Sequence, residues 1–66
     1  MKTYHVTIHH KVTLAEIGIA CVQAETSTAA RNFGVKLIEK EQNLGRLDPN
    51  AYIMAAYEVF SPQPGN

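Results

Sequence analysis

Three segments of the sequence have the residue pattern of β-strands, whereas a single segment has the spacing of a helix. Residues 3–8 alternate between apolar and polar side chains, which is the pattern of a strand with one face on a core. Residues 16–24 and 51–60 are rich in apolar residues, β-branched and aromatic ones among them, and contain no proline. The sequence therefore predicts a sheet of three strands with one helix to cover it.

The segment between the second and third predicted strands has the period of a helix, which we place over residues 27–44. Its apolar and small residues fall on one stripe, formed by Ala30, Phe33, Gly34, Leu37, Ile38 and Leu44. Thr26 is the expected N-cap, and Gly45 is the expected left-handed residue at the C-terminal end. Because a mid-helix glycine costs about 1 kcal/mol relative to alanine, Gly34 predicts a close approach of the helix backbone to the sheet.

The connections complete the predicted fold. Asp-Pro-Asn at 48–50 predicts a turn before the third strand. No Gly, Pro, Asn or Asp marks a turn in residues 9–15, so a hairpin of uncertain register and one long bent strand are both open. We predict an α+β fold of order β-β-α-β, a single small domain over residues 1–60. In it the helix packs on one face of a three-stranded, mainly antiparallel sheet with the first strand in the middle. Residues 61–66, with two prolines and a glycine, are expected to be a disordered tail.

Length and composition favour association. The chain has 66 residues and one cysteine, Cys21, which excludes an internal disulfide. A domain of this size buries only about 60% of the surface that its unfolded chain exposes, and association is one way to compensate. Six Lys and Arg balance six Asp and Glu, so net charge does not point to nucleic acid. Without a signal peptide or a long apolar segment, the expected location is the cytoplasm.

The second and third predicted strands are apolar on both faces, which is usual for strands that are buried on both faces. One helix can cover only one face, and the small residues Gly18, Ala20 and Ala24 suit that side. The uncovered side then carries a predicted dimer or partner surface, formed by Ile17, Ile19 and Cys21 and flanked by His5, Thr7 and His9. The alternative is that Ile17 and Ile19 face the helix and the small residues are exposed.

The three histidines and the other reactive side chains do not form a recognisable site. His5 and His9 would lie about 13 Å apart on one strand, and His10 points to the other side, so one chain is not expected to hold a metal. Metal binding across an interface and a response to pH stay open. The sequence contains no phosphate-binding loop, nucleophile elbow or paired-cysteine motif. We therefore expect no cofactor and no enzymatic activity.

A second candidate surface is basic and lies on the predicted helix and just beyond it. Its residues are Arg31, Lys36, Lys40 and Arg46. Glu39 and Glu41 are interleaved with them, as on an ordinary solvated helix face. This surface makes a nucleic-acid-binding accessory protein the alternative to a protein-binding module.

The stretch VQAETSTAA has the pattern V-x-A-x-(S/T)-x-x-x-A, in which a strand enters a helix through a Ser/Thr cap. Its matching positions are Val22, Ala24, Thr26 and Ala30. With an N-terminal strand before it and another strand after it, the pattern resembles small β-β-α-β proteins of phages, plasmids and other mobile elements, a build that some anti-CRISPR proteins share. The resemblance implies a fold, and it carries over no functional residue. It leads us to expect a non-enzymatic homodimer that acts as an inhibitor or accessory factor by occupying a protein surface.

Overall fold

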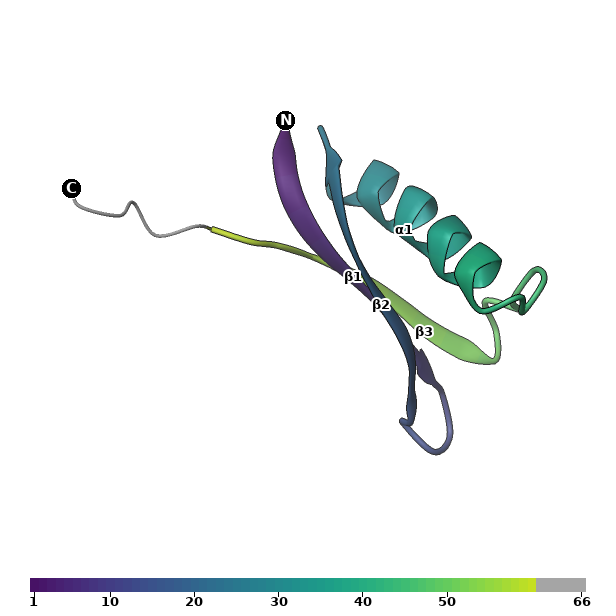
Figure 1. Ribbon diagram of the computed structural model, residues 1–66. Helices are drawn as coiled ribbons and strands as arrows, with labels where there is room; N and C mark the ends of the chain where they lie inside the picture. Colours follow the sequence, from purple (N-terminus) through teal and green to yellow (C-terminus); the bar gives the residue numbers. More distant parts are fainter. Residues whose placement is uncertain (61–66) are drawn as a thin grey trace.

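The computed structural model describes residues 1–60 of the chain, so the predicted tail at 61–66 lies outside the described residues. The elements are β1 (Lys2–His10), β2 (Glu16–Ala24), α1 (Ser27–Glu41) and β3 (Tyr52–Glu58). The strands form one open sheet of order β2-β1-β3 in which both pairs are antiparallel, and α1 lies on one side of it (Figure 1). The predicted α+β fold and the central position of the first strand are confirmed.

The core lies between α1 and the side of the sheet that faces it. Tyr4, Val6 and Ile8 of the central strand supply its large side chains and are almost fully buried. Val6 lies between Ala20 of β2 and Ala56 of β3 in the register, and these small neighbours leave room for the helix above. The remaining buried apolar residues are Val22, Ala24, Ala30 and Ile38.

Two glycines allow α1 to approach the sheet closely. A Cβ added at Gly34 would lie 2.5 Å from the Cβ of Val6, so the helix backbone rests directly on the central strand. A Cβ added at Gly18 of β2 would lie 2.5 Å from a methyl group of Ile38. The close approach predicted at Gly34 is therefore confirmed, and the small residues of β2 do face the helix.

The start of α1 follows the prediction. The hydroxyl of Thr26 accepts a hydrogen bond from the backbone N–H of Ala29 at 3.1 Å, which confirms Thr26 as the N-cap.

The end of α1 differs from the prediction, because the helix stops at Glu41 rather than near Leu44. Asn43 adopts a left-handed conformation with φ 55°, and its N–H donates to the carbonyl of Lys40. The N–H of Leu44 donates to the carbonyl of Glu39 at 2.9 Å. These bonds form a Schellman end with asparagine in the position where glycine is commoner.

Three residues of the predicted helix and its end therefore have other roles. Gly45 is left-handed, with φ 69°, but it lies beyond the cap and does not end the helix. Phe33 and Leu44 do not join the core: Phe33, on the helix flank, is 53% exposed, and Leu44 follows the helix end. The fully buried stripe of the helix is narrow, and Val35 and Leu37 beside it are partly buried against the core. That stripe is Ala30, Gly34 and Ile38.

The first two strands form a hairpin, so the alternative of one long bent strand is wrong. The ring Nδ1 of His10 accepts hydrogen bonds from the backbone N–H groups of Val12 and Thr13, at 3.2 and 3.3 Å. Leu14 completes the turn in a left-handed conformation with φ 61°. A histidine ring thus replaces the Asn or Asp side chain that commonly organises such a turn.

The turn before β3 is the one predicted. The side-chain carboxylate of Asp48 accepts a hydrogen bond from the N–H of Asn50 at 2.9 Å. The backbone carbonyl of Asp48 accepts one from the N–H of Ala51.

Candidate functional site

The side of the sheet opposite α1 carries no other element of residues 1–60 (Figure 1), and we call it the open face. All three strands contribute to it in alternation. Its residues are His5, Thr7 and His9 of β1, Ile19 and Cys21 of β2, and Ile53, Ala55 and Tyr57 of β3.

Three residues that pair across the strands form the middle of the open face, and the outer two are apolar. Thr7 of β1 lies between Ile19 of β2 and Ala55 of β3. The side chain of Ile19 is 54% exposed although it stands on a regular strand. Thr7 itself is buried, and its hydroxyl oxygen has no hydrogen-bond partner among the described residues. The middle of this face therefore combines a buried threonine with an exposed isoleucine and a small alanine.

Aromatic and aliphatic side chains of β3 extend the apolar surface. Tyr57, which pairs with His5, is 60% exposed, and Ile53, which pairs with His9, is 43% exposed. The predicted surface contained neither of them. The signal was present in the sequence, because the alternation of the third strand places Ile53 and Tyr57 on one side, but which side could be assigned only from the register with β1.

The structure places five of the six predicted surface residues together on the open face: His5, Thr7, His9, Ile19 and Cys21. The sixth residue, Ile17, lies at an irregularity in the pairing of β2 with β1. Gly18 and Glu16 pair with consecutive residues of β1, so Ile17 is the extra residue of a bulge, and it is half-buried.

Histidine and cysteine lie side by side on the open face without forming a reactive pair. Cys21 pairs with His5 across the two strands, and its free thiol makes no hydrogen bond with that ring. His10 is on the helix-facing side, where its ring packs edge-on against Tyr52 with centroids 5.5 Å apart. Within residues 1–60, no three His, Cys, Asp or Glu side chains gather as a metal site would require.

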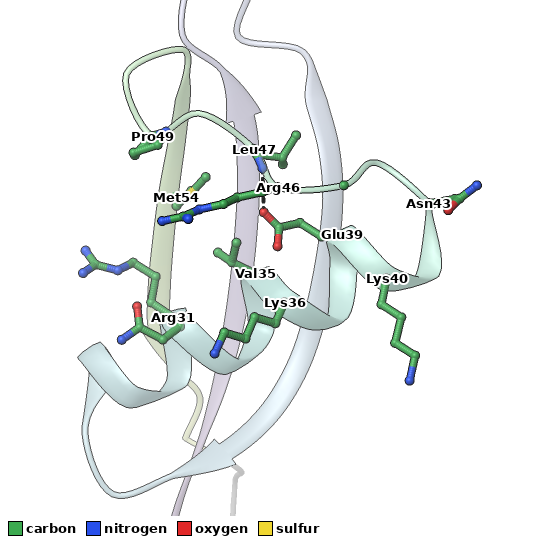
Figure 2. Close-up of a pocket in the computed structure, with 12 residues that line it drawn as sticks. Arg31, Val35, Lys36, Glu39, Lys40, Asn43, Arg46, Leu47, Pro49 and Met54 are labelled. Atoms are coloured by element: carbon green, nitrogen blue, oxygen red, sulfur yellow. Dashed lines mark hydrogen bonds between the residues drawn. The ribbon is translucent and has the colours of Figure 1, made fainter.

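The second predicted surface is a hollow rather than a flat helix face. A hollow of about 890 Å³ lies between α1, the segment that follows it and β3 (Figure 2), and we call it the basic hollow. All four predicted basic residues line it: Arg31, Lys36 and Lys40 from α1 and Arg46 from the following segment. Figure 2 shows the side chain of Arg46 extending toward Met54 of β3.

Apolar side chains contribute much of the rest of the basic hollow. They are Val35, Leu47, Pro49 and Met54. One carboxylate, that of Glu39, also lines it, and it accepts a hydrogen bond from the N–H of Leu47 at 2.7 Å. This bond holds the segment after the helix against α1 and so positions Arg46 (Figure 2).

The fold and these two surfaces describe a small α+β domain with one uncovered sheet face. Comparison with known proteins gives no matching family, no matching curated protein and no matching solved structure. Among residues 1–60, no helix is long and apolar enough to span a membrane.

Proposed function

We propose that the protein is a non-enzymatic protein-binding module that forms a homodimer through its open face. The observation that carries the proposal is the exposure of three large side chains there, Ile19, Ile53 and Tyr57. They lie on β2 and β3, on either side of Thr7, which is buried in the central strand, so all three stand on one face of the sheet.

Burial of these side chains supplies the driving force. Full burial of an isoleucine side chain contributes about 1.5–3 kcal/mol, and roughly half of Ile19 and of Ile53 is exposed in one chain. Each of these side chains therefore gains on the order of 1 kcal/mol when it is covered. A twofold dimer uses every contact residue twice, which doubles the effect of each.

Face-to-face packing is the arrangement that covers the patch. Two open faces would stack as a β-sandwich with their sheets about 10 Å apart, and the two α1 helices would lie on the outside. His5 and His9 would then be at the interface, and the basic hollow of each chain would remain accessible. The resemblance to small mobile-element proteins fits a dimer of this kind acting in the cytoplasm as a stoichiometric inhibitor or accessory factor.

Sedimentation velocity over a range of protein concentrations tests the dimer. The wild-type chain should sediment at twice the monomer mass of 7.3 kDa at micromolar concentration. Ile19→Asp should sediment as a monomer, because its carboxylate would be buried without a partner at the centre of the interface. Ile19→Thr, which keeps a β-branched side chain, should weaken the dimer with less effect on the fold.

The matched control is Val12→Asp in the hairpin turn, which introduces the same charge in place of an exposed apolar side chain away from the open face. This variant should remain dimeric. A dimer that survives Ile19→Asp, or that is lost equally in Val12→Asp, would show that the chains associate through another surface.

A further inference from the structure

The basic hollow concentrates positive charge in a chain whose net charge is zero. Six basic residues balance six acidic ones in the whole sequence. Four of the six basic residues line this one hollow with a single carboxylate, so its formal charge is four minus one, or +3. The sequence disperses these residues over sixteen positions, from Arg31 to Arg46, and the turn after α1 brings them together.

The cations of the hollow are not neutralised within the described part of the chain. Among the described residues, the ion pair that the structure shows lies outside the hollow, between Lys2 of β1 and Glu58 of β3, at 3.9 Å. Glu39 points to the backbone N–H of Leu47 rather than forming an ion pair with a basic side chain. The guanidinium groups of Arg31 and Arg46 therefore have their donors available for an added anion.

The apolar residues that line the hollow indicate which kind of anionic ligand would fit it. In Figure 2, Val35 lies between the two arginines and Met54 lies beside the end of the Arg46 side chain. Leu47 and Pro49 complete the apolar lining. A ligand that offered only phosphates would leave this apolar area uncovered. None of the residues that line the hollow is aromatic, whereas single-stranded nucleic acids are commonly bound by stacking on aromatic side chains.

We propose that the basic hollow binds an acidic protein segment in which an apolar residue is flanked by carboxylates. The carboxylates would pair with Arg31 and Arg46, whose planar guanidinium groups can donate two parallel hydrogen bonds to one carboxylate. The apolar side chain would rest on Val35 and Met54. This site is separate from the open face, so the inference does not depend on the proposed dimer.

Fluorescence anisotropy with three labelled probes tests the inference. The first is a short peptide in which leucine alternates with pairs of aspartates, and the second is the same peptide with serine for leucine. The third is a single-stranded oligothymidine of equal net charge. The leucine peptide should bind tightest, and the serine peptide about tenfold more weakly, since a buried leucine side chain contributes about 1.5–3 kcal/mol.

A pair of double variants locates the binding site. Arg31→Gln with Arg46→Gln should weaken binding of the leucine peptide by about tenfold or more, because two charged contacts are lost. Lys2→Gln with Lys11→Gln removes the same net charge elsewhere and should leave the affinity unchanged. Circular dichroism and sedimentation of both variants, expected to match the wild type, separate this result from any change in fold or in dimer formation.

Three outcomes would overturn the inference. Binding of the oligothymidine as tight as that of the leucine peptide would make the hollow a nucleic-acid site. Equal binding of the leucine and serine peptides would show that the apolar lining takes no part. Equal losses of affinity for the leucine peptide in the two double variants would show that binding depends on the net charge of the protein and not on the hollow.

Discussion

Gly34 is the residue on which the packing of the helix depends most. Alanine there would improve the helix propensity by about 1 kcal/mol, but its Cβ would lie 2.5 Å from the Cβ of Val6. Since Val6 is fully buried in the central strand, it cannot move aside. Overpacking of this kind costs about 1–3 kcal/mol.

A 2.5 Å contact between two Cβ atoms places the overpacking cost at the upper end of this range, about 2–3 kcal/mol. After subtraction of the gain in helix propensity, about 1 kcal/mol, we expect Gly34→Ala to lower the free energy of unfolding by about 1–2 kcal/mol, measured by urea denaturation. Asn32→Ala, at an exposed position of the same helix, is the control and should raise it by a few tenths of a kcal/mol. A Gly34→Ala variant as stable as the wild type would mean that α1 does not lie this close to β1.

Thr7 is the second residue with a distinctive environment, because its hydroxyl is buried and has no partner among the described residues. Valine has nearly the same shape and removes the unpaired group. Thr7→Val should raise the free energy of unfolding by about 1 kcal/mol. The comparison is best made at protein concentrations low enough for the proposed dimer to dissociate, so that association does not contribute to stability.

Thr3→Val is the matched control for Thr7, since Thr3 stands on the same strand and face but is only half-buried. It should change stability little, because a hydroxyl that reaches water carries no unpaired-group penalty. A loss of stability in Thr7→Val would show that the Thr7 hydroxyl does have a hydrogen-bond partner.

At the scale of elements, the turn between β1 and β2 is organised by the side chain of His10, together with the hydroxyl of Thr13, which accepts from the N–H of Ala15. The His10 ring accepts from two backbone N–H groups of the turn, and it also packs on Tyr52. The two contributions can be separated by substitution. Phenylalanine keeps the aromatic contact and loses the acceptor, whereas asparagine keeps an acceptor and loses the ring.

We expect His10→Phe to accelerate amide hydrogen exchange at Val12 and Thr13 and to lower stability by about 1 kcal/mol. His10→Asn should preserve slow exchange at these two amides, because an asparagine oxygen can organise the same turn. Unchanged exchange in His10→Phe would contradict the role assigned to Nδ1.

The elements also show what the sequence can and cannot specify. The strands and the N-cap at Thr26 follow from alternation and capping chemistry, which are local. The helical period places Ala30, Gly34 and Ile38 on the buried side of α1, but it also includes Phe33, which the narrow sheet leaves exposed. The end of α1 was mispredicted because Asn43 takes the left-handed position that was assigned to Gly45. The hairpin turn was left open because histidine is not among the residues that usually mark one.

At the scale of the whole molecule, the open face was largely predictable, because one helix cannot cover both faces of a sheet that is apolar on both. The contribution of Ile53 and Tyr57 of β3 to that face was not predicted, because it depends on the register of β3 with β1. The basic hollow could not be predicted as a concave site, since it forms only where the segment after α1 folds back and Glu39 holds Leu47.

The central claim is that the open face is covered when the chains associate, and the free thiol of Cys21 reports on it directly. Cys21 is exposed on that face and is the single cysteine of the chain. We predict that its rate of alkylation by a maleimide falls with increasing protein concentration, in proportion to the fraction of chains that remain monomeric. In Ile19→Asp the rate should be independent of concentration. A wild-type rate that stays constant while the sedimenting mass doubles would contradict the account, because the chains would then associate with the open face uncovered.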